Sequence, residues 1–112
     1  MMNPKANFWI EENGKVVLST WRVNLLEAIA ETGSISAAAS KLGISYRRAW
    51  EKINECEERL GVKLIETQTG GIGGGGSYLT PVATDYVHRF RQFTTGLNGI
   101  VNQRFEKFFQ QE

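Results

Sequence analysis

The chain has 112 residues, of which 41% are hydrophobic and 22% charged, so its size and composition suit one globular domain with a single modest core. Its formal net charge of +1 does not by itself indicate a polyanionic partner, and its single cysteine, Cys56, excludes an internal disulfide. Because no signal-like N-terminus and no run of eighteen apolar residues is present, we expect a soluble, cytoplasmic protein that does not enter a membrane.

A β-hairpin is predicted within residues 1–19. The segment NFWIEENGKVVLS places Asn13 and Gly14 between two short β-prone runs. Both residues tolerate positive φ, and such a pair between β-prone runs is the strongest short-range hairpin signal.

Two helices are predicted to follow the hairpin. The first covers residues 20–31 and stops near Gly33, with apolar residues at helical spacing: Trp21, Leu25, Ala28 and Ile29. The second is short and rich in alanine, with Ser34 or Ser36 as its N-cap and Gly43 as a left-handed terminator.

A third, longer helix is predicted from Ser45, a candidate N-cap, to Gly61. Its inward face is expected to carry Ala49, Ile53, Cys56 and Leu60. At 100° per residue, Arg47 and Glu51 then point outward. The two flanks would carry Arg48 with Glu55, and Trp50 with Asn54. For Trp50, packing is favoured over contact with a ligand.

The segments VKLIET and SYLT are predicted strands, joined by a run with six glycines between positions 70 and 76. Glycine weakens regular elements, so this run is a predicted loop. Thr80 and Pro81 then predict the start of a final helix. That helix is expected to break near Gly96 and Gly99 and to present an exposed stripe for dimerisation, composed of Tyr86, Phe90, Phe93 and Leu97.

This order predicts a mainly α fold with small β-hairpins, a winged helix-turn-helix. We divide the chain into a hairpin (1–19), a DNA-binding domain (20–81) and C-terminal helices for dimerisation (82–112). Although the chain is nearly neutral, no acidic residue lies between Glu31 and Glu51, whereas Lys41, Arg47 and Arg48 do. The first turns of the third helix are therefore the predicted DNA-reading surface.

Catalytic alternatives find little support. The glycine run formally contains G-x-G-x-x-G, but a dinucleotide-binding loop must lead into a helix, and here a strand is predicted to follow. No nucleophile with a base and no paired carboxylates are apparent, and Cys56 is expected to be inert. His88, the only histidine, has no second metal ligand nearby. We expect no enzyme activity, no cofactor and no metal site.

The segment from Arg22 to Phe93 resembles the N-terminal DNA-binding domain of ModE-type molybdate-responsive transcription regulators, which is similar to LysR-type winged helix-turn-helix domains. LLEAIAETGSISAAASKLGISYRRAW and TGGIGGGGSYLTP carry the resemblance. It implies a homodimer on a palindromic site of double-stranded DNA. The expected DNA-facing residues are Ser34, Ser36, Ser45, Tyr46, Arg47, Arg48, Lys52, Thr67, Thr69, Gly71, Ile72, Gly73 and Ser77.

Two departures from that family limit what the resemblance implies. Its members continue into small oxyanion-binding domains, for which this chain is too short, so we expect no molybdate sensing by the chain itself. A separate effector protein, control through expression level and no regulation at all remain alternatives. Ile72 stands where the family commonly has lysine, which argues against a charged phosphate contact at the wing tip.

The leading hypothesis is thus a dimeric, sequence-specific DNA-binding transcription regulator without the molybdate-sensing domain. The alternative is a protein-protein interaction module that uses the winged-helix fold without DNA and docks through its aromatic C-terminal helix. The small net charge keeps this alternative open.

Overall fold

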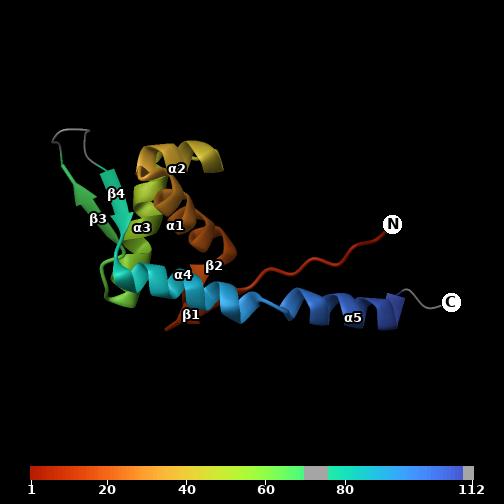
Figure 1. Ribbon diagram of the computed structural model, residues 1–112. Helices are drawn as coiled ribbons and strands as arrows, with labels where there is room; N and C mark the ends of the chain where they lie inside the picture. The colour runs from red at the N-terminus through yellow and green to blue at the C-terminus, as the bar shows by residue number, and fades with distance from the viewer. Residues whose placement is uncertain (70–75, 110–112) are drawn as a thin grey trace.

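The computed structural model describes residues 1–69 and 76–109. Within these ranges the chain forms five helices and two antiparallel hairpins (Figure 1). The predicted mainly α fold with small β-hairpins is confirmed. The elements in chain order are β1 (Trp9–Glu12), β2 (Lys15–Ser19), α1 (Thr20–Thr32), α2 (Ile35–Leu42), α3 (Tyr46–Leu60), β3 (Ile65–Gln68), β4 (Gly76–Leu79), α4 (Pro81–Thr94) and α5 (Leu97–Phe109).

The N-terminal hairpin forms at the predicted turn. Asn13 and Gly14 have φ values of 54° and 78°, so both adopt the positive φ that the two-residue connection requires. β1 is exposed along its whole length, whereas β2 buries Val17 and Leu18 against the helices. The hairpin therefore covers the core with one strand only.

Serine and glycine set the limits of the first three helices. Each begins after a serine whose side-chain oxygen accepts a backbone N–H three residues later: Ser19, Ser34 and Ser45. Each ends at a glycine with φ near 70°, a left-handed conformation that costs glycine little: Gly33, Gly43 and Gly61. Of the two predicted caps for α2, Ser34 is the one used.

The main core lies where α1, α2 and α3 meet. Its most completely buried large side chains include Leu25, Ile29, Ile53 and Leu64. Ala38 and Ala49 are fully buried, and their small size lets α2 and α3 approach α1 closely. This packing leaves one side of α3 free, as a helix-turn-helix requires.

The second hairpin, β3–β4, follows α3 and is tied to the turn between α1 and α2. The backbone N–H of Ser77 donates to the carbonyl of Gly33 at 2.9 Å. The glycine run is followed by strand β4, as predicted, which does not suit a dinucleotide loop. Residues 70–75 of the run lie outside the described ranges.

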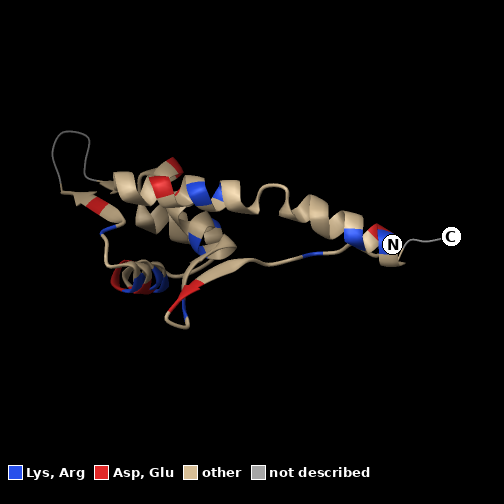
Figure 2. Cartoon of the chain, turned by 90° about the horizontal axis from the view of Figure 1, so that it is seen from below, with Lys and Arg blue, Asp and Glu red and all other residues tan. Residues whose placement is uncertain are grey.

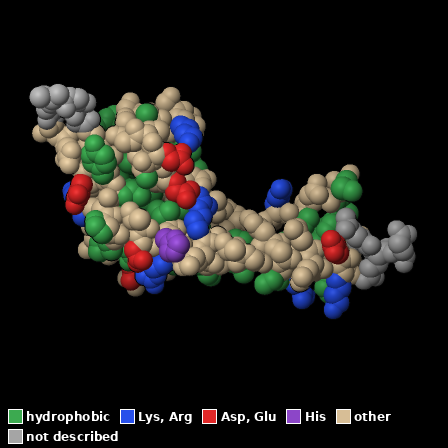
Figure 3. Space-filling model, in the orientation of Figure 1, with side chains coloured by type: hydrophobic (Ala, Val, Ile, Leu, Met, Phe, Trp, Pro, Cys, Tyr) green, Lys and Arg blue, Asp and Glu red, His purple; other side chains and the backbone are tan. Residues whose placement is uncertain are grey.

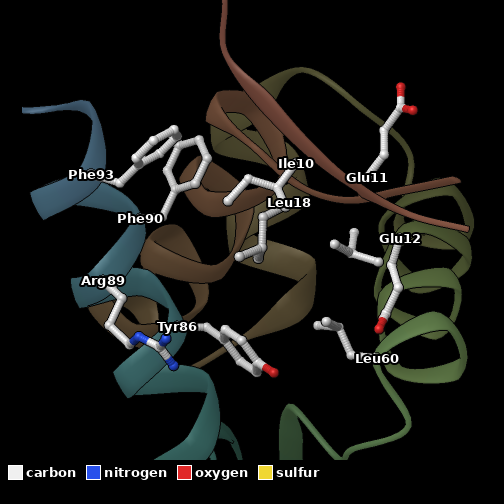
Figure 4. A pocket seen from close by; sticks show the side chains of 10 residues that line it. Ile10, Glu11, Glu12, Leu18, Leu60, Tyr86, Arg89, Phe90 and Phe93 are labelled. Atoms are coloured by element: carbon white, nitrogen blue, oxygen red, sulfur yellow. The ribbon is translucent and has the colours of Figure 1, made fainter. Parts of the chain in front are cut away.

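Thr80 and Pro81 start α4 as predicted, but the expected exposed stripe on this helix is wrong at Phe90. Phe90 is only 1% exposed because Leu18 of the hairpin and Val23 of α1 cover it. Figure 4 shows Phe90 facing Leu18, with Phe93 beside it. Phe93 is 52% exposed, so the stripe is open to solvent only further along the helix.

The chain breaks at Gly96, where φ is 90°, and continues as α5, which leads away from the body of the molecule (Figure 1). None of the thirteen residues of α5 is buried. The principal extents of the molecule, 64 × 31 × 22 Å, reflect this projection. None of the helices in the described ranges combines the length and apolarity needed to cross a bilayer.

Candidate nucleic-acid interface

The first turn of α3 is exposed on the surface of the helix-turn-helix. The Arg47 side chain is 90% exposed and Tyr46 is 50% exposed, and Ser45 and Arg48 also lie on the surface. Ser45 caps the helix by accepting the Arg48 N–H at 3.1 Å. The predicted outward direction of Arg47 is confirmed.

The exposed cations near this turn differ in their partners. Arg47 pairs with Glu51 at 3.3 Å, and Lys41 pairs with Glu31 at 2.6 Å. Glu31, at the edge of the acid-free segment, thus partly neutralises the expected basic patch. Both pairs are solvated and hence weak, so either cation can exchange its carboxylate for a phosphate at little cost.

Arg48 has no ion-pair partner within residues 1–69 and 76–109. It therefore presents an uncompensated guanidinium beside the helix N-terminus, where the helix dipole also favours anions. A guanidinium can form bidentate hydrogen bonds with phosphate or with a guanine edge. This first turn is thus chemically suited to contact with nucleic acid.

Residues from three elements line one surface hollow next to Tyr46. They come from the start of α2, from the start of α3 and from the β3–β4 hairpin, and they include five predicted site residues: Ser34, Ser36, Tyr46, Thr67 and Ser77. Ser36 and Thr67 are exposed. The fold therefore gathers hydroxyl groups and the N-terminus of α2 beside the first turn of α3, a combination that suits sugar-phosphate contacts.

The remaining predicted site residues, and Ser77 at the edge of the hollow, are placed less favourably for contact with nucleic acid. Ser77 is only 7% exposed, and its backbone joins the hairpin to Gly33, so its placement favours a role in holding the hairpin. The Lys52 side chain is 24% exposed and reaches Glu55 at 3.5 Å, away from the outer face of the first turn. Thr69 is exposed. Gly71, Ile72 and Gly73 lie outside the described residues.

Sequence reasoning missed Arg22, which supports α3 from behind. Its guanidinium donates to the Lys52 carbonyl at 3.4 Å, to Cys56 Sγ at 3.2 Å and to Glu55 at 3.0 Å. Burial opposes the charge, but the hydrogen bonds to Cys56 and Glu55 outweigh it and raise the pKa of Arg22. The same Arg22 hydrogen bond lowers the pKa of Glu55. No local pattern links these residues, because they meet only in the tertiary fold.

The far end of α3 uses its charges for structure. Arg59 donates to the Val16 carbonyl of β2 at 2.8 Å and lies 3.4 Å from Glu55, which joins the N-terminal hairpin to the helix. Glu57 accepts the backbone N–H groups of Leu64 and Ile65. The acids of this half of the helix are thus largely engaged in holding the fold.

Charges of both signs are mixed on the parts of the molecule that the figures show. Figure 2 shows both signs of charge around α3, and Figure 3 shows acidic and basic side chains interspersed on the face in view. There is therefore no broad basic field on that face. On that face the charge distribution does not by itself indicate a polyanionic partner.

The sequence of the chain matches one family of bacterial regulatory proteins. The profile described as bacterial regulatory helix-turn-helix protein, lysR family, matches residues 22–83. The molybdenum transport protein ModE of Herbaspirillum seropedicae is 48% identical over 68 residues, which cover 61% of this chain and 25% of the relative. The DNA-binding transcriptional dual regulator ModE of Escherichia coli K12 is 51% identical over 59 residues, which cover 53% and 22%. The chain thus spans about a quarter of the length of these relatives.

Solved structures agree with the sequence comparison. The CbnR DNA-binding domain, solved as a complex with DNA, aligns with a TM-score of 0.60 and 25% identity, covering 78% of this chain and 93% of that one. The BenM DNA-binding domain in complex with benA site 1 DNA shares the fold, with a TM-score of 0.57 and 23% identity. The predicted resemblance to ModE and LysR-type domains is confirmed. The chain belongs to the LysR family of bacterial regulatory helix-turn-helix proteins.

Proposed function

We propose that the chain is a sequence-specific DNA-binding transcription regulator that acts in the cytoplasm as a homodimer and catalyses no reaction. The observation that supports this most is the exposed first turn of α3, flanked by the β3–β4 hairpin on a LysR-type fold. A related domain was solved in complex with DNA. The same surface of this chain carries Arg47 and Arg48 without a competing buried role.

In this proposal the start of α3 enters the major groove. Arg47 and Arg48 bind base edges or phosphates, and Ser45 and Tyr46 fix the entry of the helix. The hollow beside Tyr46 faces the sugar-phosphate backbone, with Ser36 and Thr67 as hydroxyl donors. Because the basic groups are few, specificity must depend on these contacts and on pairing of two chains.

Pairing of two chains is proposed from the C-terminal helices. α5 buries none of its residues in the monomer, and Phe93, Ile100, Phe108 and Phe109 are each more than half exposed. Large apolar side chains that are this exposed suit a surface that is covered by a partner. A two-fold dimer would double the base contacts and fit a palindromic operator.

Arginine variants test the DNA surface. Arg47→Ala and Arg48→Ala should each weaken binding to a selected operator by about 1 to 3 kcal/mol where the side chain contacts a base edge. A contact to phosphate should instead weaken binding to all sequences alike and reduce the salt slope by about one released counterion. Operator fragments are selected from random genomic DNA, and affinity is measured over a range of salt concentrations.

Arg89→Ala is the matched control, because Arg89 is also an exposed arginine paired with a carboxylate four residues away on its helix, Asp85 at 3.6 Å. It should bind like the wild type. Normal binding by both Arg47→Ala and Arg48→Ala, with unchanged circular dichroism, would show that α3 does not read DNA. Absence of wild-type binding even at low salt would instead favour a protein-interaction module.

A further inference from the structure

Arg91, in the last turn of α4, makes the only side-chain ion pair between α4 and α1 among the described residues. Its guanidinium donates to both carboxylate oxygens of Glu27, with Nε 3.2 Å from Oε2. It also donates to the side-chain oxygen of Asn24 at 2.7 Å. We call Arg91, Glu27 and Asn24 the α1–α4 clasp.

The clasp has the geometry of a strong orienting contact. A guanidinium that forms two parallel hydrogen bonds with one carboxylate is fixed in direction as well as in distance. Both side chains are 37% exposed, so solvent screens the pair only in part. The hydrogen bond with Glu27 raises the pKa of Arg91, consistent with a close ion pair.

A second anchor holds the other end of α4. The Thr80 hydroxyl donates to the Lys63 carbonyl at 2.7 Å, and the Thr80 N–H donates to the Leu64 carbonyl at 2.9 Å. Thr80 and Arg91 are eleven positions apart, or roughly 16 Å along a helix that rises 1.5 Å per residue. Because α4 is held near both ends, its direction relative to the body of the molecule is fixed.

The clasp also connects α4 to the reading helix. Glu27 and Asn24 lie on α1, and Arg22 of the same helix holds α3 through Lys52 and Glu55. α1 therefore lies between α4 and α3 and is joined to each by an arginine. If α1 and α3 move as one body, a reorientation of α4 relative to α1 also reorients α4 relative to α3.

We propose that Arg91 is a specificity-determining positioning residue, which fixes the spacing of the two operator half-sites that a dimer accepts. The inference rests on the proposed function, because it requires a homodimer joined through α4 and α5 that binds DNA. In such a dimer the direction of α4 sets the distance and rotation between the two α3 helices. One added base pair moves a half-site by about 3.4 Å and turns it by roughly 36°, so a rigid α4 admits few spacings.

The test uses a library of operators in which the selected half-sites are separated by different numbers of base pairs. Wild-type protein should show one sharp optimum. Arg91→Ala should keep its affinity for a single half-site but discriminate at least about threefold less between the optimum and its neighbouring spacings. Glu27→Gln, which keeps the shape of the site, should have the same effect to a smaller degree.

Arg89→Ala is the control here as well, because Arg89 lies on the same helix but pairs only with Asp85 within α4. It should keep the wild-type spacing profile. The reversed pair Glu27→Arg with Arg91→Glu should restore part of the discrimination. Melting curves establish whether each variant is folded. If Arg91→Ala does not fold, Glu27→Gln takes its place in the test.

The outcomes separate this inference from the proposed function. A sharp optimum that Arg91→Ala and Glu27→Gln leave unchanged overturns the role of Arg91, while the DNA-binding function stands. A wild-type protein that sediments as a monomer, or that binds no operator, overturns the proposed function and this inference with it. A broadened spacing profile together with an unchanged affinity for a single half-site supports the inference. A variant that was merely destabilised would lose affinity for the single half-site as well.

Discussion

At the scale of single residues, Arg22 helps to hold α3 in place. It is 11% exposed, and it reaches a carbonyl, a thiol and a carboxylate on α3. A guanidinium that is largely removed from water is favoured when its donors are paired, and the ionised Glu55 carboxylate supplies one of the three acceptors. Because Glu55 also contacts Arg59, the same carboxylate links α1, α3 and, through Arg59, the N-terminal hairpin.

We expect Glu55→Gln to lower the free energy of unfolding by about 1 kcal/mol at neutral pH. A charged hydrogen bond contributes more than this when buried, but the Glu55 side chain is 34% exposed and therefore partly screened. The pKa of Glu55 is lowered from its ordinary value of 4.5, chiefly by the Arg22 hydrogen bond. Its contribution is thus fully present above the unfolded-state pKa and is lost as pH falls through the folded-state pKa.

Urea unfolding at a series of pH values measures this contribution. The difference between wild type and Glu55→Gln should be constant from neutral pH down to the unfolded-state pKa and should vanish in more acidic solution. Glu58→Gln provides the control, because Glu58 is exposed on the same helix and has no ion pair among the described residues. A Glu55→Gln deficit that did not change with pH would exclude the ion pair as its cause.

At the scale of elements, Thr80 anchors the start of α4. Thr80 is 6% exposed, its hydroxyl donates to the Lys63 carbonyl, and its oxygen accepts the Ala83 N–H at 3.1 Å. Valine has the same shape without either hydrogen bond. We expect Thr80→Val to destabilise the fold by about 2 kcal/mol, because it removes the partly buried hydrogen bond to the Lys63 carbonyl and the helix cap.

Thermal or urea unfolding checks this prediction against Thr84→Val. Thr84 is exposed one turn further along α4, so that control makes the same chemical change without burial. The control should change stability by less than about 0.5 kcal/mol. Equal effects of the two substitutions would show that the cap of α4 does not anchor the helix.

Elements with local signals could be predicted from the sequence. Ser45 and Gly61 limit α3, and Asn13 with Gly14 forms a hairpin, because capping and turn chemistry act over a few residues. Contacts between distant segments could not be predicted in this way. Phe90 fits a regular apolar stripe, yet it is buried because the N-terminal hairpin folds over it.

In the candidate site too, features with a local sequence signal could be predicted and contacts between distant segments could not. The exposure of Arg47 follows from helical periodicity once Ala49 is taken as buried. Periodicity leaves the flanks of α3 undetermined, because burial there depends on which neighbour lies alongside. Arg22 and Glu55 draw the Lys52 side of the helix against α1, and the contact between Ser77 and Gly33 buries the predicted wing serine.

At the scale of the whole molecule, a packed body and the projecting helix α5 differ in what stabilises them. The body has its own core, whereas α5 contributes no buried residue to it. Short helices have little stability in water without packing. α5 carries stacked rings of Phe105 and Phe109, with centroids 5.4 Å apart, but a contact within one helix covers little surface. The proposed dimer would supply the packing that α5 lacks in the monomer.

We expect the wild-type chain to sediment as a dimer at micromolar concentration, and substitution of apolar residues of α5 by charge to dissociate it. Ile100→Asp and Phe108→Asp each place a carboxylate where a side chain more than half exposed in the monomer would be covered in a dimer. Burying an unpaired charge costs several kcal/mol, which corresponds to a loss of dimer affinity of at least about a hundredfold. The monomer itself should stay folded, because neither side chain belongs to the core.

Gln103→Asp, which adds the same charge at another exposed position of α5, is the control and should remain dimeric. If both variants remain dimeric, the two chains are joined through another surface. If the wild-type chain is a monomer, the proposed function no longer includes binding of a dimer to a palindromic operator.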